Sequence, residues 1–328
     1  MNSSPRDLRA ATAATAAIAL AALAGCAAGP ATAHVGSAVA VAGSSSSSGS
    51  PVPSSATATP THAVPTPAPG LSPPHVPGLT WVPAGPAGAG RPAVYTALTD
   101  NGAVGLLWMD ASRLRFRFVP GWKVPEGGPR LPADTRPSTW VSRMVAAFNG
   151  GFMLKDHIGG YYYAGRTVSA LRAGLGTFTI TSAGRIAVGA WGRDLRLTAH
   201  TVVVRQNLPL LVDGFRARTS PSDTPSTWGV ANGGLWTANR SALGQLADGS
   251  VVYAFGANVR PSEMAAAMVA VRARVAMVLD MNKSWPGGFT YHHSRGKVVG
   301  RGIQRGIWHQ PSVYFAPFTK DFVVAQWP

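Results

Sequence analysis

Cysteine and acidic residues are scarce in this chain. Cys26 is the single cysteine among 328 residues, so no internal disulfide can form and the core must hold without a covalent cross-link. Asp and Glu number 13 against 29 Lys and Arg, which gives a formal net charge of +16. A chain this basic attracts anionic partners, but its basic residues are dispersed and form no nucleic-acid-binding motif. We therefore expect an anionic glycan or a sugar-phosphate polymer of the wall, or anionic lipid heads, as the partner, and no nucleic acid.

The chain also lacks an apolar run of the roughly 20 residues that a membrane-spanning helix needs. Arg6 and Arg9 form a positive head before a shorter apolar stretch at residues 10–23, and Leu23-Ala24-Gly25-Cys26 follows. This order is typical of a secretory signal, and the last four residues resemble a bacterial lipobox. We expect residues 1–25 to be a lipoprotein signal peptide and Cys26 to carry a lipid anchor on the outer face of the cell membrane. The alternative is a plain secretory peptide with an incidental cysteine.

Charged residues are absent between positions 27 and 90. This stretch holds a serine run at residues 44–48 and is dense in Pro, Thr, Ala and Ser at residues 51–77. It has too little bulky apolar surface to offset the entropy of ordering. We expect residues 26–78 to be a disordered spacer and residues 79–328 to be a single globular domain.

Apolar patterns in the globular part predict mainly strands. Residues 93–98 and 104–109 flank the turn Asp100-Asn101-Gly102, which is typical of a hairpin. Residues 177–180 and 185–188 flank a second turn in the same way. A continuous apolar run at residues 275–280 indicates a strand that is covered on both faces.

Helix signals are fewer. Residues 139–145 fit either a helix or a strand. A helix is predicted from Ser262, because Met264, Met268, Val271 and Val275 recur at helical spacing. Together the elements predict an α+β (mixed α/β) fold, with one twisted, mostly antiparallel or mixed sheet and a few flanking helices.

The short supply of carboxylates allows each one to be considered as a catalytic group. Asp280 directly follows the buried strand, and a charge in such a place needs a cation, a metal or a substrate as partner. Asp213 follows another apolar run, but the adjacent Gly214 also fits an ordinary turn at the end of a strand. Asp156, beside His157, fits a solvated pair in a loop.

Four segments, in order along the chain, resemble those of the phosphodiester glycosidase family, which includes the enzyme that removes N-acetylglucosamine from a phosphodiester on lysosomal glycans. Residues 146–152 (AAFNGGF) resemble its NGGFF segment, and residues 206–214 resemble a strand that ends in Gly. Residues 239–244, followed by Asp248-Gly249, resemble its RSALG and DG block. The helix and strand that lead to Asp280 resemble the element that usually ends in LDGGGS.

The resemblance implies hydrolysis of a sugar C1–O–phosphate bond. It implies Asp280 as the catalytic carboxylate, Arg240 as the phosphate contact and Asn149 as a hydrogen-bonding catalytic residue. The same segments imply five substrate-binding residues: Gly150, Gly151, Asp213, Lys283 and Ser284. The glycines would leave room for a ligand to reach the backbone.

Several alternatives remain open from the sequence. The usual glycines of the family are replaced by Met281-Asn282-Lys283, which favours a non-catalytic binder of anionic glycans as the alternative function. Arg240 fits a structural partner of Asp280 as well as a ligand contact, and Lys283 fits a solvent-facing residue as well as a phosphate ligand. No cofactor is expected, although Asp280, Asn282 and Ser284 alternate like the oxygens of a calcium loop, without its glycine. A third reading is a structural envelope lipoprotein that acts through its charge alone.

Overall fold

The computed structural model describes residues 70–86, 90–123, 138–156, 158–229 and 236–328. The chain divides into two units, Met1–Val64 and Pro65–Pro328, and only the second contains described residues. The predicted signal peptide, the Cys26 anchor and most of the predicted spacer lie outside the described residues.

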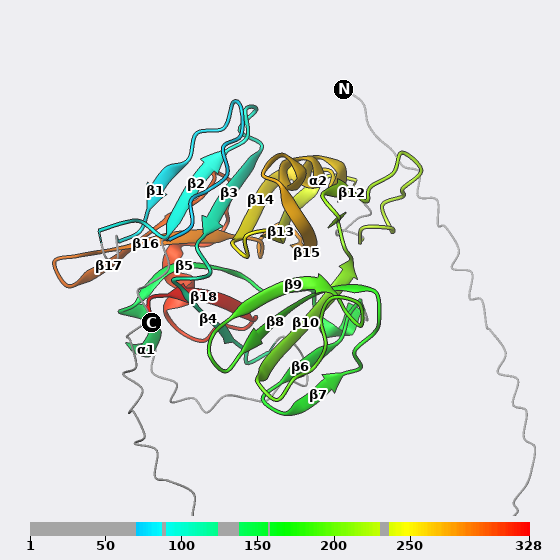
Figure 1. Cartoon of the computed structure of the whole chain (residues 1–328), viewed down its shortest axis with the longest axis horizontal. Coiled ribbons are helices and arrows are strands. Elements are labelled where there is room, and N and C mark those ends of the chain that lie inside the picture. The colour runs from blue at the N-terminus through cyan, green and yellow to red at the C-terminus, as the bar shows by residue number, and fades with distance from the viewer. Residues whose placement is uncertain (1–69, 87–89, 124–137, 157, 230–235) are drawn as a thin grey trace, which may run out of the picture. The chain divides into compact units, whose positions relative to one another are not determined.

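The described residues form an almost entirely β structure, so the predicted α+β fold is wrong. Eighteen strands build three sheets, and the two α-helices of the described part, α1 (Ser138–Val141) and α2 (Pro261–Ala270), have 4 and 10 residues. Every pair of neighbouring strands in these three sheets is antiparallel (Figure 1). Neither helix is long and apolar enough to cross a membrane.

The largest sheet has eight strands in the order β1-β2-β3-β14-β13-β15-β11-β12. They are β1 (Val82–Ala84), β2 (Val94–Leu98), β3 (Val104–Met109), β11 (Val212–Asp213), β12 (Arg216–Ala217), β13 (Ala238–Leu246), β14 (Val251–Val259) and β15 (Ala273–Met281). The predicted hairpin is confirmed as β2–β3, whose turn places Gly102 at a φ of 67°. Strand β15 is buried on both faces, as its continuous apolar run predicts.

Two five-stranded sheets complete the structure. The second has the order β7-β6-β10-β8-β9 and the third the order β17-β16-β5-β18-β4. The second contains β6 (Tyr161–Tyr163), β7 (Arg166–Ser169), β8 (Leu175–Thr181), β9 (Ile186–Ala190) and β10 (Thr201–Pro209). The third contains β4 (Arg115–Val119), β5 (Met144–Asn149), β16 (Gly288–Ser294), β17 (Lys297–Gly302) and β18 (Phe322–Gln326). The second predicted hairpin is confirmed as β8–β9.

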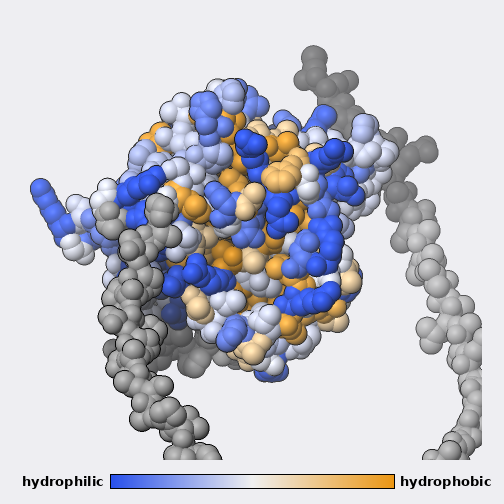
Figure 2. Space-filling model, in the orientation of Figure 1, coloured by the Kyte–Doolittle hydropathy of each residue, from blue (hydrophilic) through white to orange (hydrophobic). Residues whose placement is uncertain are grey.

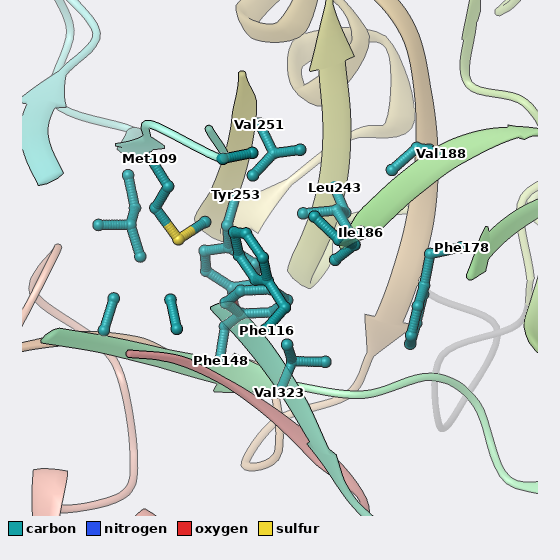
Figure 3. Packing of buried hydrophobic residues seen from close by; sticks show 14 of the residues in the cluster. Met109, Phe116, Phe148, Phe178, Ile186, Val188, Leu243, Val251, Tyr253 and Val323 are labelled. Carbon is teal, nitrogen blue, oxygen red and sulfur yellow. The ribbon is translucent and has the colours of Figure 1, made fainter. Parts of the chain in front are cut away.

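One apolar core joins the three sheets. Figure 3 shows Tyr253 and Leu243 of the large sheet beside Phe148 of the third sheet and Ile186 and Val188 of the second. The Phe148 and Tyr253 rings stack with their centroids 4.9 Å apart. A second cluster packs α2 on the other face of the large sheet. This packing fixes the ends of β5, β10, β15 and β18, where the polar residues of interest lie.

Helix α2 begins one residue before the predicted start. Pro261 occupies the first turn, where its missing N–H is not needed, and Glu263 accepts the Arg260 N–H at 2.8 Å.

Figure 2 shows hydrophilic residues dispersed over one face of the molecule, in line with the scattered basic residues of the sequence.

Candidate functional site

Asp280 lies near the end of β15, opposite Ser241 of β13, and is 4 % exposed. Its Oδ1 accepts the Met281 N–H at 2.6 Å. Its Oδ2 is buried and has no hydrogen bond among the described residues. The Lys320 ammonium lies 3.8 Å from Oδ2, which is beyond hydrogen-bond distance. Asp280 is therefore a buried carboxylate that keeps one oxygen unsatisfied.

Burial disfavours the charged form of this carboxyl and raises the pKa of Asp280 to about 6, although Lys320 and the Met281 N–H act in the opposite direction. A carboxyl group with this pKa exchanges a proton readily near neutral pH, which is the property of a general acid or base.

Asp280 contributes to the wall of a cavity of about 820 Å³, here called the Asp280 cavity. Three lysines line it: Lys155, Lys283 and Lys320. They come from the short 3-10 helix η1 (Leu154–Asp156), the turn after β15 and the segment before β18. Ser226, Ser284 and Asp156 add polar groups to the same wall. An anionic ligand would meet three cations and one protonatable carboxyl group here.

The segment Met281-Asn282-Lys283 leads into a tight turn. The Asn282 side-chain oxygen accepts the N–H groups of Ser284 and Trp285, at 2.9 Å and 2.6 Å. The Lys283 carbonyl accepts a hydrogen bond from the Asn239 amide at 3.1 Å. In the described part of the chain, no three His, Cys, Asp or Glu side chains gather as a metal site.

Asn149 is fully buried and lies outside the cavity wall. Its amide nitrogen donates to the Gly150 carbonyl at 2.8 Å and to Ser241 Oγ at 3.0 Å. Its oxygen accepts from Tyr253 Oη at 2.7 Å and from the Gly287 N–H at 3.1 Å. All four hydrogen-bonding positions of this side chain are taken up by the protein, so Asn149 ties β5 to β13 and β14.

Gly150 and Gly151 make room for buried polar side chains of the protein itself. A Cβ on Gly150 would fall against the Asp321 carboxyl group, and one on Gly151 would lie 2.6 Å from the Asn207 side-chain oxygen. Asp321 accepts a hydrogen bond from Arg205 Nε at 2.9 Å, and both side chains are buried. The space that the sequence suggests for a ligand is thus filled by the Asp321 and Asn207 side chains of the protein itself.

Arg240 is also buried, 1 % exposed, and its donors face the protein. Nε donates to the Val259 carbonyl at 3.0 Å, and Nη2 to the Trp236 carbonyl at 3.2 Å. Nη1 donates to the Trp228 carbonyl at 3.3 Å and contacts the Met281 sulfur at 2.7 Å. Burial lowers the pKa of Arg240 to about 10. This guanidinium holds backbone segments together, and it makes no ion pair with Asp280 in the described structure.

Asp213 lies in a different cavity of about 910 Å³, here called the Trp191 cavity. Arg193 binds both of its carboxylate oxygens, at 2.8 Å and 2.9 Å. Hydrogen bonds from Arg193 lower the pKa of Asp213. Of the sequence-predicted site residues, the structure therefore brings Asp280, Lys283 and Ser284 together in one cavity and places Asp213 in another. Arg240 and Asn149 lie next to the Asp280 strand, but their side chains line neither cavity.

Lys320, Lys155 and the buried polar residues behind the cavity were not predicted. Asn207 accepts the Phe152 N–H at 3.2 Å and donates to the carbonyls of Val278 and Leu279, which fixes the strand before Asp280. The sequence contains a signal for these residues in Arg205-Gln206-Asn207, three consecutive polar residues inside a strand. Lys320-Asp321 gives another, because two charges directly precede an apolar strand.

The chain matches no protein-family model and no curated protein sequence. Solved structures that are similar to it include the catalytic domain of zebrafish N-acetylglucosamine-1-phosphodiester alpha-N-acetylglucosaminidase, auto-inhibited by its pro-peptide; a hypothetical protein from Synechocystis; and a Burkholderia pseudomallei protein whose name describes export. The identities are 14 %, 13 % and 13 %, and the TM-scores are 0.43, 0.39 and 0.36. The matches cover 75 %, 76 % and 73 % of this chain and 87 %, 62 % and 75 % of the others. Because no TM-score reaches 0.5, these similarities carry no argument about function.

Proposed function

We propose that the protein is a hydrolase that cleaves a sugar-1-phosphodiester at the Asp280 cavity. The observation that carries the proposal is the buried carboxyl group of Asp280, with one oxygen unsatisfied, in a cavity of about 820 Å³ with three lysines. A carboxyl group beside several cations suits a substrate that carries both a phosphate and an acetal carbon.

Water would attack C1 of the sugar and the C1–O bond would break, giving the free sugar and a phosphomonoester. Positive charge develops at C1 in such a reaction, and a carboxylate beside it stabilises that charge or accepts the proton of the attacking water. The leaving phosphate is already an anion, so cations stabilise it without full protonation. Asp280 takes the first role in this proposal.

Lys155, Lys283 and Lys320 take the second role, in place of Arg240. Lysine binds phosphate as a mobile point charge, whereas the Arg240 guanidinium is committed to carbonyl groups. Lys320 also lies over the Trp285 ring, 5.3 Å from its centroid, which limits the positions of its ammonium group.

The second candidate function is a non-catalytic binder of anionic glycans. One observation favours it: the hydrogen-bonding groups of Asn149 and Arg240, which the resemblance assigns to the reaction, are directed into the protein. In both functions the natural ligand would be a sugar-phosphate polymer of the cell envelope, within reach of a Cys26-anchored lipoprotein on its spacer.

The test is release of the phosphomonoester from a synthetic N-acetylglucosamine-1-phosphodiester by the full chain. Removal of one acid–base group costs about a hundredfold or more in rate, so Asp280→Asn is expected to lose nearly all turnover. Lys320→Met is expected to lose about tenfold or more, since one charge on the leaving phosphate is missing. Asp156→Asn is the matched control, because this carboxylate lines the same cavity but is exposed.

Equal turnover in Asp280→Asn and the wild type would contradict the proposed mechanism. No turnover by the wild type on several sugar-1-phosphodiesters, together with saturable binding that Lys320→Met weakens, would favour the binder instead.

A further inference from the structure

The proposed reaction does not use the Trp191 cavity. Its volume of about 910 Å³ falls in the range of small-molecule sites. Two indole rings line it, the half-buried Trp191 and the buried Trp228. Arginines and aspartates supply the polar part of the wall: Arg193, Arg196, Arg218, Asp213 and Asp223.

The two cavities share a wall. Leu208 lines the Asp280 cavity, and Pro209 and Leu210, which follow it, line the Trp191 cavity. The segment at residues 226–229 is divided in the same way, with Ser226 and Gly229 on one side and Thr227 and Trp228 on the other. Ser226 and Thr227 are exposed, so an extended ligand can pass over them from one cavity to the other.

The charges of the Trp191 cavity are nearly balanced. Arg193 is shared between Asp194 and Asp213, and Asp223 accepts hydrogen bonds from Trp228 Nε1 and the Ser220 N–H, both at 2.7 Å. This distinguishes the cavity from the lysine-rich Asp280 cavity and disfavours a free phosphate as its ligand.

Donors remain available in this cavity all the same. The Arg218 guanidinium makes no hydrogen bond or ion pair with any described residue, although its charge helps to lower the pKa of Asp213. Within the described part of the chain, the Arg196 guanidinium donates only to the Gly192 carbonyl. Carboxylate acceptors beside free guanidinium donors suit hydroxyl groups, which donate and accept hydrogen bonds at once.

We propose that the Trp191 cavity is a second carbohydrate subsite, which takes a neutral sugar ring by contact with Trp191 and by hydrogen bonds to Arg218 and Asp213. An aromatic ring supplies a flat apolar surface for the C–H face of a sugar, and the polar groups at its edge bind the hydroxyls. The subsite rests on the proposed function for its role, which is to hold the sugar that neighbours the scissile unit in a polymer.

The test measures binding without turnover. The full chain is titrated with neutral tetrasaccharides of N-acetylglucosamine, β-1,4-glucose and α-1,4-glucose, by calorimetry and by tryptophan fluorescence. We expect saturable binding of at least one, weakened about tenfold by Trp191→Ala and at least about fivefold by Arg218→Ala. Arg218 is exposed, so its variant folds even if Trp191→Ala does not.

Trp308→Ala is the matched control, because Trp308 is 65 % exposed and lines neither cavity. Asp280→Asn is expected to keep the tetrasaccharide affinity while it loses turnover. The experiment therefore distinguishes failure of the subsite proposal from failure of the proposed reaction. The proposal is overturned if no tetrasaccharide binds, if Trp191→Ala and Arg218→Ala both bind like the wild type, or if inorganic phosphate displaces the bound sugar.

Discussion

At the scale of single residues, Asp280 makes folding dependent on pH. Its ordinary pKa is near 3.8 and its pKa in the folded protein is about 6. Between these values the folded state holds a proton that the unfolded state has lost, so this group reduces stability as the pH rises from about 4 to 6. Above pH 6 the full cost of burying the charge is present.

We therefore expect Asp280→Asn to raise the free energy of unfolding by about 2 kcal/mol at pH 8 and to change it little at pH 4. Denaturant unfolding at both values measures this difference. The exposed Asp156→Asn serves as the control and should change little at either pH. A gain that is the same at pH 4 and pH 8 would show that burial of charge is not its cause.

Gly150 has no room for a side chain, because the buried Asp321 carboxyl group lies against it. A methyl group there would push against the Asp321 carboxyl group, which is buried and paired with Arg205. Displacing one partner of a buried ion pair is costly, and overpacking adds to the cost. We expect Gly150→Ala to lower the free energy of unfolding by about 3 kcal/mol, measured by denaturant unfolding. Gly302→Ala is the control, since a Cβ there would first meet another atom at 3.5 Å, an ordinary contact. Equal stability of the two variants would contradict this account of Gly150.

At the scale of elements, Arg240 holds together the backbone around the start of β13. It joins β13 to the end of β14, through the Val259 carbonyl, and to the wall between the two cavities, through the Trp228 carbonyl. Loss of the guanidinium leaves buried carbonyls without donors, each of which costs about 1–3 kcal/mol.

We expect Arg240→Ala to lower the free energy of unfolding by at least about 3 kcal/mol, and to weaken function only as far as the cavity wall loosens. Thermal unfolding and phosphate affinity, measured on the same sample, separate a structural role from ligand contact. Arg216→Ala, at an exposed arginine of β12, is the control. An unchanged melting temperature with lost phosphate affinity would restore Arg240 as a ligand contact.

Strands could be predicted from the sequence because their signals are local. The β2–β3 and β8–β9 hairpins follow from alternation and turn residues, and α2 from its spacing and its proline. The fold class could not be predicted, because it depends on which strands pair over long distances. Strand β3 pairs with β14, and β5 lies between β16 and β18. Residues 139–145 form one helical turn and then the start of β5, which the sequence left undecided.

Only part of the lining of the proposed site could be identified from the sequence, for the same reason. Asp280 could be identified because a charge at the end of a buried strand needs an explanation that is visible locally. Lys320 and Lys155 could not be identified in this way. Lys320 precedes β18 and Lys155 follows β5, and the long-range pairing of these two strands brings both lysines to the cavity. Asn149-Gly150-Gly151 suggested an open site, yet the groups that approach it, Asp321 and Asn207, come from remote parts of the chain.

At the scale of the whole molecule, the folded part begins before the start that composition suggests. The sequence places that start at Leu79, where the charge-free spacer is expected to end. In the structure, Leu71, Leu79 and Trp81 pack against the second apolar cluster. The Leu71 N–H donates to the buried Asp110 carboxylate at 2.9 Å, and Trp81 Nε1 donates to the Pro74 carbonyl at 2.9 Å.

A chain that begins at residue 79 is therefore expected to be less stable than one that begins at residue 65, because it loses the Leu71 packing and a donor to Asp110. The cost is about 2 kcal/mol, for one apolar side chain and one hydrogen bond to a charged group, or a fall of about 4–8 °C in Tm for a domain of this size. Calorimetry of both chains measures it. The Leu71→Ala variant of the longer chain should show part of the loss, and His75→Ala, at an exposed residue of the same segment, should show little. Equal melting temperatures for the two chains would mean that residues 70–78 add nothing to the fold and that the domain begins at Leu79 after all.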